Sequence, residues 1–244
     1  MNKNGLTSLW FTVVPNNSKR MRGIPNAIIL REIQCMKTVE EVRNYFQNIP
    51  RCAGTCFVLR DLTSPSVCIL EATATDYVVI KEENTYVAHS NHYLSKKFRN
   101  IDTYQQDAWT VHRCKRMAEL LKNANEKDSL NSIKGQTEFL KTALADVKGK
   151  EQGISICEYA EHTNGDWETL ASVIFDPVNL HVWIKEGRPD NFKNGNNWFA
   201  IKMEANTNDN VQVLLQKEQE GSLFNTLQNA SFEHFQGKKI NAAV

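Results

Sequence analysis

Residues 85–93 read TYVAHSNHY, and the rest of the chain is interpreted outward from them. The first part alternates like a β-strand up to Ala88, and residues 89–92, HSNH, then form a polar corner. A strand that ends in hydrogen-bonding side chains is a place where a rigid scaffold presents chemistry. The alternative is a turn of solvated residues, because loops favour Ser, Asn and His.

The segment before this corner is rich in β-branched and aromatic residues and is divided by short polar breaks. Four strands are predicted: Thr55–Asp61, Val67–Thr73, Tyr77–Lys81 and Thr85–Ala88. Connections this short join hairpin neighbours, so we expect these strands to lie side by side in one antiparallel sheet.

Further toward the N-terminus, Gly5–Val14 predicts another strand. A helical pattern follows from Asn26, and its apolar face is predicted to consist of Ile28, Ile29, Ile33 and Met36. A second helix is expected to begin after Thr38, an N-cap residue whose capping box is completed by Glu41.

After the corner the pattern becomes helical and then returns to strands. Helices are predicted at Thr110–Asn123, about Gln136–Val147 and Val211–Leu227, and strands at Ile154–Glu158, Glu168–Phe175 and His181–Ile184, after which Gly187–Pro189 is expected to end the sheet. Separate blocks of strands and helices indicate an α+β fold rather than alternating parallel units. We expect one domain over residues 1–200 and a C-terminal helical extension with a tail over 201–244.

Composition excludes several classes of partner. The 29 Lys and Arg residues balance 28 Asp and Glu, so no general field attracts nucleic acid or an anionic membrane. No apolar run approaches the roughly 20 residues that span a bilayer. We expect a soluble protein with reduced thiols, and a cytoplasmic location is favoured. Cys52 and Cys56 have a spacing that a metal uses, but no second pair accompanies them, so no metal site is predicted.

Several short motifs occur in a characteristic order over Gly5 to Phe199. They are Gly5-Leu6, Gly23-Ile24-Pro25, residues 38–42 (TVEEV), Leu59-Arg60-Asp61, Leu70-Glu71, residues 90–93 (SNHY), the 110–121 helix with Arg113 and Arg116, Phe175-Asp176-Pro177 and Gly187-Arg188-Pro189. In this order they resemble the acyl-coenzyme A:6-aminopenicillanic acid acyltransferase family, the C45 group of autoproteolytic N-terminal nucleophile hydrolases, which is related to bile-salt (choloylglycine) hydrolases.

The resemblance implies a four-layer αββα sandwich. It also implies an acyl-enzyme mechanism, in which a cysteine freed by self-cleavage attacks an amide or thioester carbonyl and its own α-amino group acts as base. Asn91 matches the residue that holds the carbonyl and its oxyanion, and Arg113 matches an arginine of the active-site network. Arg116 and His92 are candidate substrate-binding residues, although a structural role is the alternative for His92.

The family's nucleophile segment has no match in this sequence. We therefore expect a sandwich that is incomplete at its N-terminus and inactive alone: a carboxyl-terminal fragment of a longer enzyme, one chain of a split enzyme, or a decayed relative kept for binding. The expected substrates are small N-acyl or amide compounds, and an acyl-thioester is a further donor. No cofactor is implied.

Two rival interpretations come from other classes of protein. One is a non-catalytic α+β interaction module, in which the polar corner and the Lys-rich helix are surface. The other is a metal hydrolase that uses His89, His92 and Asp102, although these loop residues have no regular ligand spacing.

Overall fold

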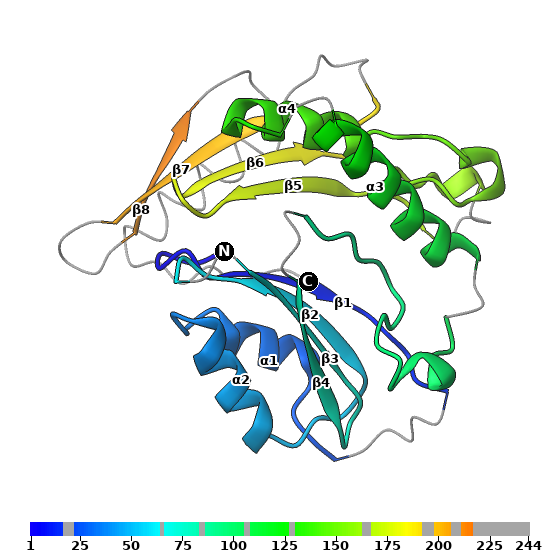
Figure 1. The fold of residues 1–244 in the computed structure, drawn as a ribbon. Helices are drawn as coiled ribbons and strands as arrows, with labels where there is room; N and C mark the ends of the chain where they lie inside the picture. Colours follow the sequence, from blue (N-terminus) through cyan, green and yellow to red (C-terminus); the bar gives the residue numbers. More distant parts are fainter. Residues whose placement is uncertain are drawn as a thin grey trace, which may run out of the picture.

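The computed structural model describes residues 1–16, 22–63, 66–82, 86–104, 108–126, 130–162, 167–191, 198–205 and 211–216. Within these residues the chain is an α+β protein with two four-stranded antiparallel sheets and four α-helices. Figure 1 shows α1 and α2 below the first sheet, with the second sheet and helices α3 and α4 above it. The two sheets therefore face each other, and the helices lie outside them.

The first sheet has the predicted meander at its centre. Its strands, in spatial order, are β1 (Thr7–Phe11), β2 (Thr55–Arg60), β3 (Val67–Ala72) and β4 (Tyr77–Glu82). Phe11 lies opposite Cys56, and Cys56 lies opposite Glu71. Because neighbours in register share a face of the sheet, these three side chains form one row across it.

Helices α1 (Asn26–Ile33) and α2 (Val39–Asn48) pack on the outer face of this sheet. Thr38 caps α2 as predicted, since its hydroxyl accepts the Glu41 N–H at 3.2 Å. Ile29 and Ile33 are buried as predicted, but Ile28 is 48% exposed and Met36 follows the end of α1. The buried face of α1 is therefore smaller than the apolar face that the sequence pattern predicts.

The second sheet is also a meander. Its strands are β5 (Ala171–Asp176), β6 (His181–Glu186), β7 (Phe199–Ala205) and β8 (Val211–Gln216), and helices α3 (Ala108–Glu126) and α4 (Ile133–Leu144) precede it. The Asp176 carboxylate accepts the N–H groups of Val178 and Asn179, which closes the predicted β5–β6 turn. Three 3-10 helices complete the elements: η1 (Arg99–Ile101), η2 (Lys150–Gln152) and η3 (Ala160–His162).

Four sequence predictions are wrong. Residues 86–88 form no strand, because the chain leaves the sheet after β4, and Thr85 lies outside the described residues. Residues 154–158 form no strand either. Residues 211–216 form β8 where a helix was predicted, and 217–227 lie outside the described residues. The sheet also continues beyond Gly187 into β7 and β8.

The division into residues 1–200 and 201–244 stays a prediction, although its boundary falls inside β7. Of the helices in the described part of the chain, none combines the length and the apolar character that crossing a bilayer requires.

Candidate functional site

The polar corner is held in place by buried carboxylates. Glu71 accepts the N–H groups of Leu94 at 2.5 Å and Ser95 at 3.0 Å, and Asp102 accepts the Tyr93 N–H at 2.5 Å. Burial alone raises the pKa of Glu71, but bonds from His89, Ser95 and Leu94 outweigh it and hold that pKa below its usual range. The corner is therefore anchored by a buried, ionised carboxylate that accepts backbone N–H groups.

Asn91 and Arg113 are in direct contact. Arg113 Nη2 donates to Asn91 Oδ1 at 3.0 Å, and Asn91 Nδ2 donates to the carbonyl of Thr12, beside the end of β1, at 3.2 Å. A guanidinium has donors only, so it fixes which end of the amide faces it. The amide nitrogen, with a second N–H still to donate, is thereby directed away from Arg113.

Arg113 is itself held from three sides. Its Nε lies 3.3 Å from Glu158 Oε1, and its guanidinium stacks over Trp109 with 4.4 Å from Cζ to the ring centroid. Burial lowers the pKa of Arg113, and the nearby carboxylate partly reverses this. Burial also raises the pKa of Glu158, against the effect of Arg113. This arrangement makes Arg113 a fixed support for Asn91 rather than a mobile surface charge.

His92 is a buried, neutral side chain. Its Nδ1 lies 3.2 Å from Thr110 Oγ1, and that hydroxyl donates to Ser90 Oγ at 3.0 Å. Burial lowers the pKa of His92 to about 4, and the neighbouring His89 contributes further. The ring thus ties the corner to the start of α3, and the substrate-binding role of His92 stays a prediction.

Arg116 points to a different part of the molecule. Its guanidinium binds Asp146 with a 2.8 Å Nη2–Oδ2 contact and Glu119 with a 2.8 Å Nη1–Oε2 contact. These bonds raise the pKa of Arg116, with the Asp146 bond as the largest cause. The structure does not bring Arg116 to Asn91, and its substrate-binding role stays a prediction.

An apolar cavity of about 440 Å³ opens between the two sheets. Arg113, His89 and Ser90 contribute polar atoms to its wall. Its apolar wall comes from both sheets, from α3 and α4 and from two loop segments, and includes Leu9, Phe11, Val58, Val87, Met117, Leu121, Leu140, Leu144, Ile156 and Val173. Arg113 therefore lies on the wall of an apolar chamber and binds Asn91, which is not itself among the residues that line the chamber.

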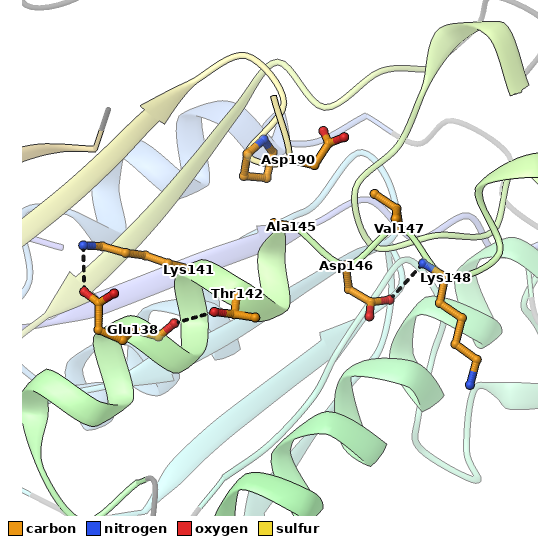
Figure 2. A pocket seen from close by; sticks show the side chains of 9 residues that line it. Glu138, Lys141, Thr142, Ala145, Asp146, Val147, Lys148 and Asp190 are labelled. Atoms are coloured by element: carbon orange, nitrogen blue, oxygen red, sulfur yellow. Dashed lines mark hydrogen bonds and ion pairs between the residues drawn. The ribbon is translucent and has the colours of Figure 1, made fainter. Parts of the chain in front are cut away.

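A second hollow, of about 710 Å³, lies at the C-terminal end of α4. Figure 2 shows two contacts of its charged side chains: Lys141 Nζ lies 3.0 Å from Glu138, and Asp146 accepts the backbone N–H of Lys148 at 3.2 Å. Asp146 also binds Arg116. These pairs leave few charged groups for a ligand, so the hollow is a weaker site candidate than the cavity.

One cluster was missed by the sequence analysis. Cys56 Sγ lies 3.3 Å from His89 Nε2, and the same nitrogen lies 3.6 Å from Glu71 Oε1. Burial raises the pKa of the Cys56 thiol well above its usual range, and Glu71 adds to this. The cross-strand register of the β2–β3 hairpin was the available signal, because it places Cys56 and Glu71 opposite each other.

The described cysteines are all free thiols, and none lines the cavity. Burial is also the first cause that raises the pKa of Cys68 to about 11 and of Cys157 to about 12. Inert buried thiols of this kind differ from catalytic cysteines, whose pKa is lowered in electropositive surroundings.

The chain is thus an α+β protein with two facing antiparallel sheets, an apolar cavity between them, and a bond from Arg113 on the cavity wall to Asn91. The chain belongs to the acyl-coenzyme A:6-aminopenicillanic acid acyl-transferase family, whose family model matches residues 1–191. A search among curated proteins found no match.

Proposed function

We propose that this chain supplies the acyl-binding cavity and the carbonyl-binding amide of a C45-like acyltransferase or linear amide hydrolase. Membership of the acyl-transferase family supports the reaction class. The single observation that carries the proposal is the 3.0 Å bond to Asn91 Oδ1 from Arg113, a residue of the cavity wall. This bond turns the Asn91 amide nitrogen away from Arg113, and in the proposal the N–H that the Thr12 carbonyl does not use faces the carbonyl of the bound substrate.

Asn91 is suited to this task on chemical grounds. Its Nδ2 carries two N–H donors, and one of them is used by the Thr12 carbonyl. The remaining donor stabilises an oxyanion without itself titrating. Arg113 is a positioning residue in this scheme, since it acts through Asn91 and its own charge is offset by Glu158.

The cavity favours an apolar acyl group. About 440 Å³ lies within the range of small-molecule sites, and aliphatic and aromatic side chains form most of its wall. An N-acyl compound or an acyl-thioester would place its chain among Val58, Met117 and Leu140 and its carbonyl toward Asn91. The acceptor, water or an amine, would approach from the polar end.

The attacking thiol in this proposal comes from a cysteine outside these 244 residues, freed by self-cleavage on the same polypeptide or carried by a partner chain. The buried, raised-pKa thiols of this chain support that assignment. The arrangement of helices outside two facing sheets also supports the αββα sandwich of the N-terminal nucleophile hydrolases (Figure 1). Six free thiols favour a reducing compartment such as the cytoplasm.

The proposal is tested with the chain alone and with the chain extended by the coding sequence that precedes it in its gene. Both proteins are assayed with p-nitroanilide amides of increasing acyl length, and their masses are measured. We expect turnover only in the extended protein, after cleavage ahead of a cysteine. Asn91→Ala in that protein should lower kcat by about 10²–10³-fold, because it removes an oxyanion donor.

Asn48→Ala is the matched control, since Asn48 is an exposed amide at the end of α2 that bonds only its own helix at the Asn44 carbonyl. It should leave kcat unchanged. Full activity of Asn91→Ala would remove the proposed role of the amide. Turnover by the chain alone that is lost in Cys56→Ser would move the nucleophile to Cys56 and overturn the assignment of the thiol.

A further inference from the structure

Three potential metal ligands converge beside the polar corner. Cys56 and Glu71 are cross-strand partners on β2 and β3, and His89 reaches them from the segment that follows β4. Their ligand atoms all lie within 4.8 Å of one another. Cys56 and Glu71 have no exposed surface, and the His89 side chain is 1% exposed. The cluster is therefore a built, interior site, not a chance grouping on the surface.

The geometry differs from that of a nucleophile–base–acid triad. A triad histidine uses one ring nitrogen for the nucleophile and the other for the carboxylate. Here Cys56 Sγ and Glu71 Oε1 both approach Nε2, at 3.3 and 3.6 Å, while the buried Nδ1 has no hydrogen-bond partner among the residues that the structure describes. Convergence of a sulfur, a nitrogen and an oxygen on one point is the arrangement of a cation site.

The charges lead to the same conclusion. Glu71 is fully buried, and among the described residues the only cationic side chain placed within ion-pair distance of it is His89, which is charged only when protonated. Hydrogen bonds from His89, Leu94 and Ser95 stabilise this carboxylate, but they leave its negative charge without a permanently cationic partner among the described residues. A divalent cation would balance one carboxylate and one thiolate completely, with a neutral imidazole as the third ligand.

We propose that Cys56, Glu71 and His89 bind a thiophilic divalent cation, with Zn²⁺ as the best fit to a sulfur–nitrogen–oxygen set. Ligand atoms at about 2.0–2.3 Å from a tetrahedral zinc are about 3.3–3.6 Å apart. Two of the three separations already match this range, at 3.3 and 3.6 Å. The third, at most 4.8 Å, requires a movement of about 1 Å. Binding converts the Cys56 thiol to a thiolate and releases its proton to the buffer.

Such an ion would fasten the polar corner to the first sheet. His89 precedes Asn91 by two residues, and Glu71 already holds the backbone of Leu94 and Ser95. An ion on Nε2 of His89 joins β2, β3 and this segment at one point. Its role is to position the corner, and the ion itself takes no part in the acyl-transfer chemistry proposed above.

The test titrates the reduced, metal-free chain with Zn²⁺ in competition with a chromophoric chelator, and then with Co²⁺. We expect one tight site per chain and a thiolate-to-cobalt charge-transfer absorption. Free Zn²⁺ at about 100-fold above the dissociation constant should raise the melting temperature by about 5–10 °C. Absence of a tight site in the reduced chain would overturn the proposal.

Variants assign the site. Cys56→Ser and His89→Gln should each weaken Zn²⁺ binding by more than about 100-fold. This exceeds the loss expected when a residue that only hydrogen-bonds to a metal ligand is removed. Cys157→Ser is the matched control, because Cys157 is also a buried thiol beside a carboxylate, 3.2 Å from Asp190 Oδ1, and it should bind zinc normally. Unchanged zinc affinity in folded Cys56→Ser would show binding elsewhere and also overturn the proposal.

Discussion

The two halves of the molecule have sheets with the same meander order of strands but different packing. The first half, β1–β4 with α1 and α2, and the second half, β5–β8 with α3 and α4, each contain a four-stranded antiparallel meander and two helices. In the first half, ten residues between the helices and the sheet form one buried cluster. In the second half, Leu170 is 77% exposed and Trp167 is 63% exposed, immediately before β5. The same order of strands in the two sheets therefore does not give the same degree of side-chain burial.

The difference in burial indicates that the two halves contribute unequally to stability. Buried polar anchors of the first half fix the polar corner: Glu71 binds the backbone at residues 94 and 95, and the Tyr93 hydroxyl donates to the Ala72 carbonyl at 2.7 Å. Both halves contribute partly covered walls to the cavity, such as Leu9 in β1, which is 40% exposed, and Val173 in β5, which is 41% exposed. Stability is thus expected to come mainly from the first half, while the space for a ligand lies between the two.

The largest expected effect is on the core of the first half. Phe46→Ala removes a ring with no exposed surface that packs against Phe57 at 5.9 Å between centroids, and it should lower the free energy of unfolding by about 3–5 kcal/mol. Val173→Ala in β5 should cost less than about 1 kcal/mol, because that side chain is already partly solvated. Urea denaturation measures both. Equal losses of unfolding free energy in the two variants would contradict the expected difference in stability between the halves.

The next effect concerns the pH dependence of the polar corner. His92 has its pKa lowered to about 4, chiefly by burial, whereas the unfolded chain has the ordinary value of about 6.5. The unfolded state therefore binds more protons, so stability is complete above pH 6.5 and falls by about 2–3 kcal/mol as the pH drops to about 4. Urea midpoints measured across this range, with a chelator present, check the slope.

His92→Gln should remove that part of the slope, because the amide cannot take up a proton. A loss of stability below about pH 4.5 should persist in this variant. It belongs to carboxylates such as Glu71, whose folded pKa lies below the usual range. An unchanged slope between pH 6.5 and 4 in His92→Gln would show that another group titrates there.

The sequence predicted the elements that depend on local chemistry. The Thr38 cap, the turn at Asp176 and the meander of β2–β4 follow from side chains within a few residues of one another. The order of the family's motifs also drew attention to Asn91 and Arg113, whose roles stay predictions. Their mutual bond was not predicted, because it joins positions 22 residues apart in the chain.

Two of the wrong predictions have a physical explanation. Residues 154–158 have strand-like composition, but their backbone bonds other groups: Cys157 N donates to the Asp146 carbonyl and Glu158 N donates to Thr169 Oγ1. The sequence of residues 211–216, VQVLLQ, fits either a strand or one face of a helix. In the structure these residues form a strand because they pair with β7. Non-local partners determine both outcomes, and a short sequence window does not contain them.

A smaller effect on stability distinguishes a structural role of Arg116 from a role in substrate binding. Arg116 lies on α3 and contacts Asp146 in the loop after α4. The Arg116 and Asp146 side chains are 17% and 15% exposed, and Arg116→Gln should lower the free energy of unfolding by about 1–2 kcal/mol. Arg43→Gln, which breaks the more exposed pair with Glu40, should cost less than about 0.5 kcal/mol. Unchanged stability together with a raised KM in the acyl-transfer assay would instead assign Arg116 to substrate binding.

The smallest expected loss of stability comes from removing an N-cap hydroxyl, and α2 and α4 provide one such cap in each half. Thr38 Oγ1 accepts the Glu41 N–H at 3.2 Å in the first half, and Ser132 Oγ accepts the Gly135 N–H at 3.1 Å in the second. Replacing either hydroxyl residue by Ala should destabilise its own helix by about 1 kcal/mol. Amide hydrogen exchange separates the consequences, because it measures the opening of each segment. Thr38→Ala should speed exchange throughout the well-packed first half, whereas Ser132→Ala should act mainly on α4. If Ser132→Ala accelerated exchange in both halves alike, they would unfold as one unit, and their different packing would not give them different stability.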